Sequence, residues 1–304
     1  MKKIFYCLCA VAAMLFTSCS DEATSASNGK QSVVTFTTEL PKNINTRTFA
    51  DGLTATKLTY AVYEKDSQTP LVVSKKVVTF DSNRKATVSL RLANGKSYDI
   101  LFWADAPTSP YTFDENAQTI TVNYNATAND ETRDAFFWAE KDLAVNGTIA
   151  KDILLYRPFA QVNVGAQDYD AATTVAFKTV KSELKVNTVY TTLNLHSGEV
   201  SGETPATFAL SDIPADTETF PVVLTPAVKY LAMNYLLMAK DKELVDVTFT
   251  AQAEDGAEIT RNFNNIPVQR NYRTNIYGNI LTEVANFNIQ IIPDFNDSDY
   301  NVAQ

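Results

Sequence analysis

The stretch that decides the fold reads Ser-Val-Val-Thr-Phe-Thr-Thr-Glu-Leu and covers residues 32–40. Its apolar side chains recur at every second position, so Val34, Phe36 and Leu40 fall on one face of an extended chain. A strand of this kind lays its apolar face on a hydrophobic core. Pro41 follows directly and ends the strand, because proline has no amide hydrogen for a ladder. The stretch predicts a half-buried β-strand.

Short apolar or alternating runs of the same kind continue along the chain. In the first half they cover Lys57–Tyr63, Leu71–Phe80, Ala86–Leu92, Ser97–Trp103 and Thr119–Tyr124. Asn94-Gly95 between two of these runs predicts a tight hairpin. In the second half they cover Thr173–Val180, which can include a helical turn, then Val186–Leu195, Thr219–Leu224, Ala232–Ala239, Leu244–Ala251, Glu258–Phe263, Thr274–Leu281 and Phe287–Ile292. No long amphipathic helical pattern interrupts them, so the sequence predicts an all-β protein.

The length of the chain provides for two packed cores. It has 304 residues, of which 45% are hydrophobic, and such a chain commonly divides into two domains. An apolar run that ends at Gly165 closes the first half. We therefore expect an N-terminal β-sandwich domain at 32–165 and a C-terminal β-sandwich domain at 166–304.

The N-terminus has the layout of an export signal. Lys2 and Lys3 precede a short apolar run, and the run closes with Leu15-Phe16-Thr17-Ser18-Cys19. A cysteine directly after small residues resembles the lipobox of bacterial lipoproteins, which implies a signal peptide at 1–18 and a lipid on Cys19. Residues 19–31 are small and polar and predict a flexible linker. The alternative is an ordinary secretory peptide that is cut elsewhere.

Composition excludes several classes of function. Loss of residues 1–18 leaves 24 basic against 35 acidic side chains, a net charge of −11, so we expect no nucleic acid partner. All cysteines lie at or before Cys19, and His196 is the one histidine. The mature chain therefore offers no disulfide, no cysteine nucleophile and no thiolate metal site. We expect no enzyme, no cofactor and no metal.

Three later stretches carry a resemblance to a known family. They are Arg157–Val164 (RPFAQVNV), Tyr190–Gly202 (YTTLNLHSGEVSG) and Asn271–Thr282 (NYRTNIYGNILT). With the lipobox, they resemble the fimbrillin-like lipoproteins of Bacteroidales, close to a subgroup defined as a domain of unknown function. The resemblance implies two transthyretin-like β-sandwich domains and a role as a fimbrial (pilus) subunit on the cell surface. The acidic pair Asp21-Glu22 behind Cys19 resembles the signal for the outer face of the outer membrane.

The resemblance also implies a mode of assembly. In the family, an arginine-specific protease cuts behind the first strand, and a neighbouring subunit's strand fills the groove that the lost strand leaves. Arg47 and Thr48 stand at the matching position here, in a polar loop seven residues beyond the first strand. The exchanged strand would then be the one that carries Val34, Phe36 and Leu40. The alternative is that Arg47 is an ordinary solvated loop residue.

The C-terminus contains a candidate donor strand. Phe287, Ile289 and Ile291 alternate with polar residues, as a strand that fills a neighbour's groove must do. The same pattern also fits a closing strand of the chain's own domain. After the Asn271–Thr282 stretch only residues 283–304 remain, which is shorter than the C-terminal appendage of family shaft subunits. The subunit could therefore be a cap, an anchor or a surface lipoprotein that binds a glycan or host ligand without polymerising.

Other candidate sites have simpler explanations. Asp294, Asp297 and Asp299 lack the glycine and distal glutamate of a calcium loop and fit a solvated tail. His196 lies in a turn with no partner that the sequence defines. Trp103 and Trp138 could stack on sugars, but each lies in an apolar run that favours core packing. No pair of carboxylates is singled out as a glycosidase acid and base, so a hydrolase is the weakest class.

Overall fold

Strands make up almost all of the regular structure in the computed structural model. It describes residues 30–41, 49–71, 76–124, 126–282 and 286–292. The elements in chain order are β1 (Gln31–Glu39), β2 (Lys57–Glu64), β3 (Lys76–Thr79), β4 (Lys85–Ala93), β5 (Lys96–Asp105), β6 (Tyr111–Asp114), β7 (Thr119–Val122), β8 (Ala126–Thr127), the 3₁₀ helix η1 (Glu131–Arg133), β9 (Phe136–Val145), β10 (Ile149–Leu154), β11 (Phe159–Ala166), α1 (Tyr169–Thr174), β12 (Thr179–Asn194), β13 (Val200–Asp212), β14 (Lys229–Leu237), β15 (Glu243–Ala253), β16 (Glu258–Val268), β17 (Arg273–Asn279) and β18 (Asn286–Ile292). The all-β prediction is confirmed.

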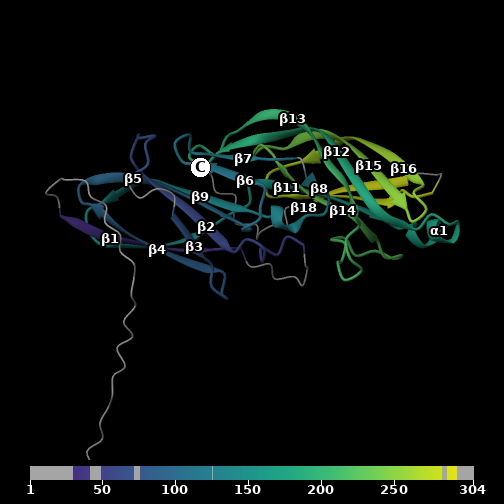
Figure 1. The fold of residues 1–304 in the computed structure, drawn as a ribbon, viewed down its shortest axis with the longest axis horizontal. Helices are drawn as coiled ribbons and strands as arrows, with labels where there is room; N and C mark the ends of the chain where they lie inside the picture. Colours follow the sequence, from purple (N-terminus) through teal and green to yellow (C-terminus); the bar gives the residue numbers. More distant parts are fainter. Residues whose placement is uncertain (1–29, 42–48, 72–75, 125, 283–285, 293–304) are drawn as a thin grey trace, which may run out of the picture.

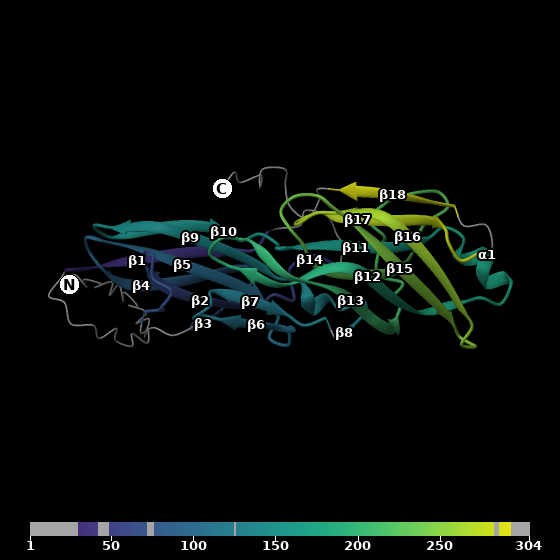
Figure 2. The ribbon, with the colours of Figure 1, turned by 90° about the horizontal axis from the view of Figure 1, so that it is seen from above.

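The strands form two layered bodies that follow one another along the long axis of the molecule (Figures 1 and 2). The first body packs the sheet β10-β1-β4 against the sheet β3-β2-β5-β9. The second body packs the sheet β14-β11-β17-β18 against a larger sheet, β16-β15-β12-β13-β8 with β7 and β6 attached. The paired sheets explain the alternating apolar faces, because one face of each outer strand meets the core.

Strands β2 and β5 are buried on both faces, which gives the two bodies a common wall. Tyr60 and Phe102 point into the core shared with β1 and β4. Their neighbours Ala61, Leu101 and Trp103 point to the opposite face, into the core of the second body. Because successive side chains of a strand alternate between faces, a strand that lines two cores must be apolar throughout. The central parts of the two strands, LTYAVY in β2 and ILFWA in β5, are almost entirely apolar.

Strand pairing crosses the boundary that the sequence predicts at residue 165. β11 spans that position and pairs with β14 and β17 of the second body. In addition, β7 pairs with β12, and β8 pairs with β13, so strands from the first half of the chain extend the second body's sheet. The division into 32–165 and 166–304 therefore remains a prediction about independent folding units.

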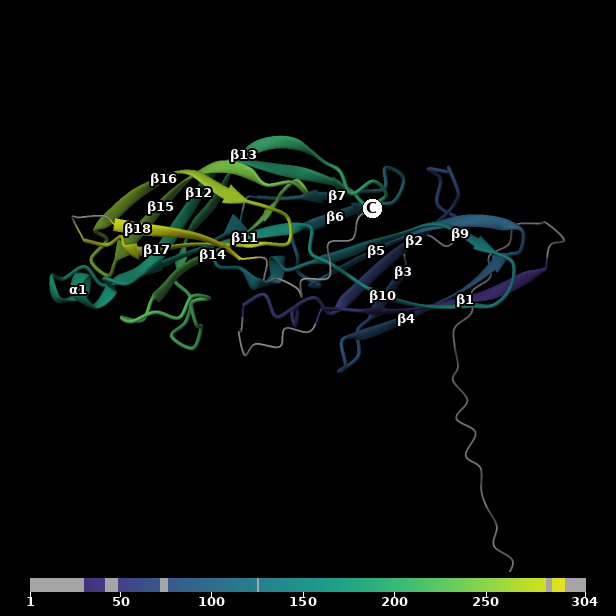
Figure 3. The same cartoon turned by 180° about the vertical axis from the view of Figure 1, so that it is seen from behind.

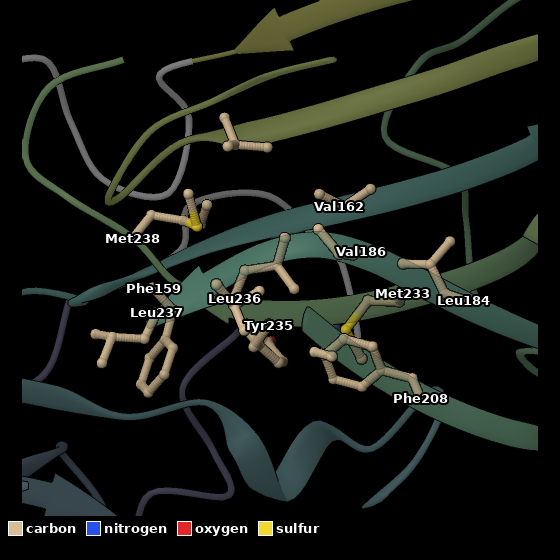
Figure 4. Packing of buried hydrophobic residues seen from close by; sticks show 14 of the residues in the cluster. Phe159, Val162, Leu184, Val186, Phe208, Met233, Tyr235, Leu236, Leu237 and Met238 are labelled. Atoms are coloured by element: carbon tan, nitrogen blue, oxygen red, sulfur yellow. The ribbon is translucent and has the colours of Figure 1, made fainter. Parts of the chain in front are cut away.

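Gly165 has a packing role inside β11. A Cβ atom at this position would lie 2.3 Å from Val228 Cγ1 and 2.7 Å from a carbon of the Phe220 ring, closer than any real contact. The residues that approach it belong to the irregular connection between β13 and β14. Figure 4 shows part of the hydrophobic core of the second body, including Phe159 of β11, Leu184 of β12 and Phe208 of β13.

One predicted strand is wrong. Thr219–Leu224 lies in the irregular connection between β13 and β14, where Pro221 cannot donate to a ladder. Phe220 in this connection packs on Tyr230, with ring centroids 5.2 Å apart. Thr173–Val180 holds the end of α1, a turn and the start of β12, so the helical turn that the prediction allowed is present. The sequence patterns also failed to predict strands β6, β8, β9, β10 and β13.

Candidate functional site

The predicted exchange strand is the middle strand of its sheet. β1 pairs in parallel with β10 and antiparallel with β4, and Phe36 lies opposite Lys151 on one side and Val88 on the other. Figure 3 shows β1 in the first body beside these two strands. Its removal would separate β4 from β10 and leave their facing backbone groups unpaired. We call this position, bounded by β4 and β10, the β1 slot.

The side chains predicted to face the core do so. Val34 and Phe36 are fully buried and Leu40 is 2% exposed. The Phe36 ring meets the edge of Phe102 on β5, with ring centroids 5.3 Å apart. Thr38, the polar member of this face, is also buried and donates a hydrogen bond from its hydroxyl to the Ala86 carbonyl at 3.0 Å. The β1 slot thus has three apolar positions and one polar position.

The residues just after the predicted cleavage segment are fixed to the body of the protein through Ala50. Its amide donates to Glu131 Oε1 at 2.6 Å, and its carbonyl accepts a hydrogen bond from Arg157 Nη2 at 2.7 Å. Arg157 also donates from Nε and Nη2 to the two carboxylate oxygens of Asp134, at 2.6 and 2.8 Å. The Tyr235 hydroxyl donates to Glu131 Oε2 at 2.9 Å. We call Glu131, Asp134, Arg157 and Tyr235 the Ala50 cluster.

Arg157, Asp134 and Tyr235 of the Ala50 cluster are buried and Glu131 is half-buried, which perturbs the charges of the cluster. The side chains of Arg157 and Asp134 are 1% and 0% exposed. Burial alone would lower the pKa of Arg157, but the adjacent Asp134 carboxylate outweighs this and holds that pKa above its ordinary value. Burial, together with the nearby Asp134, raises the pKa of Glu131 well above its ordinary value. The guanidinium also lies over the Phe136 ring, 4.4 Å from its centroid.

The candidate donor strand pairs within its own chain. β18 lies at the edge of the sheet β14-β11-β17-β18 and pairs antiparallel with β17 (Figure 2). Phe287 and Ile289 remain 38% and 39% exposed, and Ile291 is half-buried. The Phe287 ring packs edge-on against the Phe263 ring, with ring centroids 4.9 Å apart. β18 therefore closes its own sheet in the isolated chain, although its apolar face is poorly covered.

Several predicted residues lie outside the described part of the chain. These are Cys19, Arg47, Thr48, Asp294, Asp297 and Asp299. The predictions for lipidation, proteolytic processing and a solvated acidic tail therefore remain predictions. Within the described ranges, no helix is long and apolar enough to cross a membrane. The same ranges contain no group of three or more His, Cys, Asp or Glu side chains placed to hold a metal ion.

The histidine and the tryptophans have defined surroundings. His196 Nε2 lies 3.0 Å from Asp99 Oδ2, so it joins the β12–β13 turn to β5. The sequence alone did not predict a partner for His196, because Asp99 is 97 positions away in the chain. Trp103 is 1% exposed and packs against Tyr111 and Phe159, which confirms core packing. Trp138 is half-buried and meets the edge of Tyr156.

The sequence did not predict that the residues of the Ala50 cluster come together. Glu131, Asp134 and Arg157 are charged residues in or beside aromatic runs, and Tyr235 belongs to a distant strand. The available signal was Arg157 itself, which follows Ile153–Tyr156 and precedes Pro158 and Phe159. A charge inside such an apolar run is expected to be buried with a partner. The identity of that partner could not be read from the chain.

Solved structures share this architecture. Two are described as a "putative cell adhesion protein", from Bacteroides uniformis ATCC 8492 and Bacteroides ovatus ATCC 8483, and each is 10% identical to this chain. The first covers 87% of this chain and 98% of its own, with a TM-score of 0.51. The second covers 86% and 97%, with a TM-score of 0.50. These likenesses show the fold and confirm the expected β-sandwich class.

A third structure is the tip fimbrial protein Mfa3 from Porphyromonas gingivalis. It is 9% identical and covers 86% of this chain and 99% of its own, with a TM-score of 0.49. No curated protein matches the sequence. A family model described as a family of unknown function does match, over residues 25–304. The chain therefore belongs to the DUF6562 family.

Proposed function

We propose that this protein is a surface-exposed fimbrial or adhesive subunit, assembled by exchange of β1 for a strand of a neighbouring subunit. The observation that carries the proposal is the position of β1 between β4 and β10, with Val34, Phe36 and Leu40 buried. The descriptions of the two Bacteroides structures as cell adhesion proteins support an adhesive role. Processing at Arg47-Thr48 would free β1, since these residues follow it in the chain.

The burial free energy of the β1 side chains makes an empty β1 slot unfavourable. Burying one large aliphatic or aromatic side chain contributes about 1.5–3 kcal/mol. Val34, Phe36 and Leu40 together therefore contribute roughly 5–9 kcal/mol. A typical domain has a net stability of only about 5–15 kcal/mol. A chain that loses β1 would therefore expose a groove that requires another strand.

The asymmetry around residues 42–48 favours loss of β1 rather than of the chain that follows. Downstream, the Ala50 amide donates a hydrogen bond to Glu131 and the Ala50 carbonyl accepts one from the buried Arg157. Upstream, β1 is held within its sheet by one ladder to β10 and one ladder to β4. A cut within 42–48 would leave Ala50 attached and make β1 a separate strand.

β18 is the candidate donor in this proposal. It offers Phe287, Ile289 and Ile291 at the alternate positions that the β1 slot requires. Its partial exposure in the isolated chain supports a strand that can leave β17 for a neighbour. The second candidate function, a non-polymerising receptor for a glycan or host ligand, is favoured by the pairing of β18 with its own β17.

We further propose that Cys19 carries a lipid that anchors the precursor to the outer membrane. The support is the signal layout, the lipobox resemblance and the acidic pair behind Cys19. Two or more acyl chains, at about 0.8 kcal/mol per buried methylene, give stable anchoring.

Limited digestion with an arginine-specific protease tests the assembly proposal. Cleavage after Arg47 should give a nicked chain that forms a ladder of assemblies in size-exclusion chromatography, while the intact chain remains monomeric. Arg47→Ala should block both results. The Ile289→Asp, Ile291→Asp double variant should still be cut but should not assemble, because an unpaired carboxylate in an apolar groove costs several kcal/mol. Cleavage without any assembly would favour the receptor function.

A further inference from the structure

Arg84 joins the two ends of the predicted cleavage loop. It follows the turn between β3 and β4, and its Nη1 atom donates to the Pro41 carbonyl at 3.0 Å and to the Asp51 carbonyl at 2.6 Å. Pro41 lies just before residues 42–48, and Asp51 lies shortly after them. One guanidinium therefore bridges the chain on both sides of the segment that contains Arg47.

The backbone around Arg84 is fixed in the geometry that this bridge needs. Asp81 Oδ1 accepts hydrogen bonds from the Asn83 amide at 2.8 Å and the Lys85 amide at 2.9 Å. Arg84 has a φ of 63°, an uncommon value for a residue with a side chain. Its carbonyl accepts a hydrogen bond from the Leu40 amide at 3.1 Å. Both the backbone and the side chain of Arg84 therefore hold the end of β1.

The two ends of the bridge differ in what else holds them. Beyond Asp51, the chain continues to Thr54, whose hydroxyl donates to the Glu131 carbonyl at 3.0 Å, and Ala50 is held by the buried cluster. The downstream carbonyl is thus a fixed point. Through Arg84, this fixed point is connected to Pro41 at the end of β1. The connection consists of hydrogen bonds and does not depend on an unbroken peptide chain.

We infer that Arg84 is a positioning residue that keeps β1 docked after the chain has been cut between Pro41 and Asp51. This inference rests on the proposed exchange of β1. A nicked subunit remains closed, and β1 leaves only when its ladders and the Arg84 bridge are broken together. Arg84 thus delays opening of the β1 slot until a partner strand competes for it.

The test uses a cut that does not depend on Arg47. A recognition sequence for a site-specific protease replaces residues 43–46, and a fluorescent label is placed at the N-terminus of the full chain. After complete cutting, the rate at which the labelled β1 peptide separates is measured in the same mild urea concentration for each variant. Arg84→Ala should release the peptide at least tenfold faster than the parent, equivalent to about 1.4 kcal/mol. Arg84→Lys, which keeps the charge without the planar fork, should lie between them.

Arg91→Ala provides the matched control, because Arg91 is an exposed arginine on the same strand β4. Its release rate should equal that of the parent. Equal release rates for Arg84→Ala, Arg91→Ala and the parent would overturn the inference. If Arg84→Ala fails to fold uncut, Arg84→Lys takes its place, and an unchanged rate in that variant overturns the inference in the same way.

Failure of the inference is distinguishable from failure of the proposed function. The release rate reports only how β1 is held, whereas assembly and natural cutting at Arg47 are measured separately. A slow, Arg84-dependent release in a protein that never assembles would contradict the fimbrial proposal but would still support the inference about Arg84.

Discussion

Removal of the charge on Asp134 is the sharpest test of the Ala50 cluster. Asp134→Asn preserves the shape of the side chain but takes away the carboxylate that faces Arg157 at 2.6 and 2.8 Å. The guanidinium, 1% exposed, would then be a buried cation with an amide in place of its counter-ion. Breaking a buried ion pair by removing one partner costs about 3–5 kcal/mol.

That cost can be converted into a melting temperature. For a chain of this size, each 1 kcal/mol shifts the Tm by roughly 2–4 °C, so Asp134→Asn should lower it by about 6–20 °C. Thermal unfolding followed by circular dichroism, with urea unfolding as a second measurement, would give the value. Because Arg157 also holds the Ala50 carbonyl, limited proteolysis should show new cuts around residues 49–54 in the variant.

The matched control is Asp142→Asn. Asp142 pairs with Lys65 at 2.6 Å, but the two side chains are 54% and 47% exposed. An exposed pair is screened by water and salt, so this variant should melt with the parent. Equal shifts for Asp134→Asn and Asp142→Asn would refute the reasoning that burial makes the Arg157–Asp134 pair important. An unchanged proteolysis pattern would refute its connection to Ala50.

Two further predictions concern Glu131 and Cys19. Because the folded-state pKa of Glu131 lies above its unfolded value, its contribution to stability is full below about pH 4.5 and is lost as the pH rises through the folded-state pKa. The Glu131→Gln variant cannot ionise at this position, so its Tm should fall less than that of the parent between pH 4.5 and pH 8. Parallel curves of Tm against pH for the two proteins would contradict a raised pKa of Glu131. Cys19→Ala should remove the protein from the outer membrane fraction, and protease shaving of whole cells should no longer detect it at the surface. Continued surface anchoring of the variant would rule out the lipoprotein proposal.

Local sequence patterns determined the strands and their faces. The alternation of Val34, Phe36 and Leu40 along β1 and the residue after it predicted which side chains are buried, because neighbouring side chains of an extended chain point to opposite sides. The continuous apolar character around Trp103 likewise predicted burial, and Trp103 is 1% exposed. The errors fell where proline and packing replaced a ladder, as at Thr219–Leu224. These successes and failures depend on residues close together in the chain.

The tertiary structure alone decided which strands pair and which charges meet. The parallel partner of β1 is β10, more than one hundred residues away, and β7 pairs with β12 across the predicted domain boundary. Arg84 reaches Pro41 and Asp51, while Ala50, Glu131, Arg157 and Tyr235 come from four separate parts of the chain. The local sequence pattern determines which face of a strand a side chain lies on. Its contact partner depends on the packing of elements that are distant in the chain. The entropy cost of bringing those elements together is compensated by contacts that no short stretch of sequence contains.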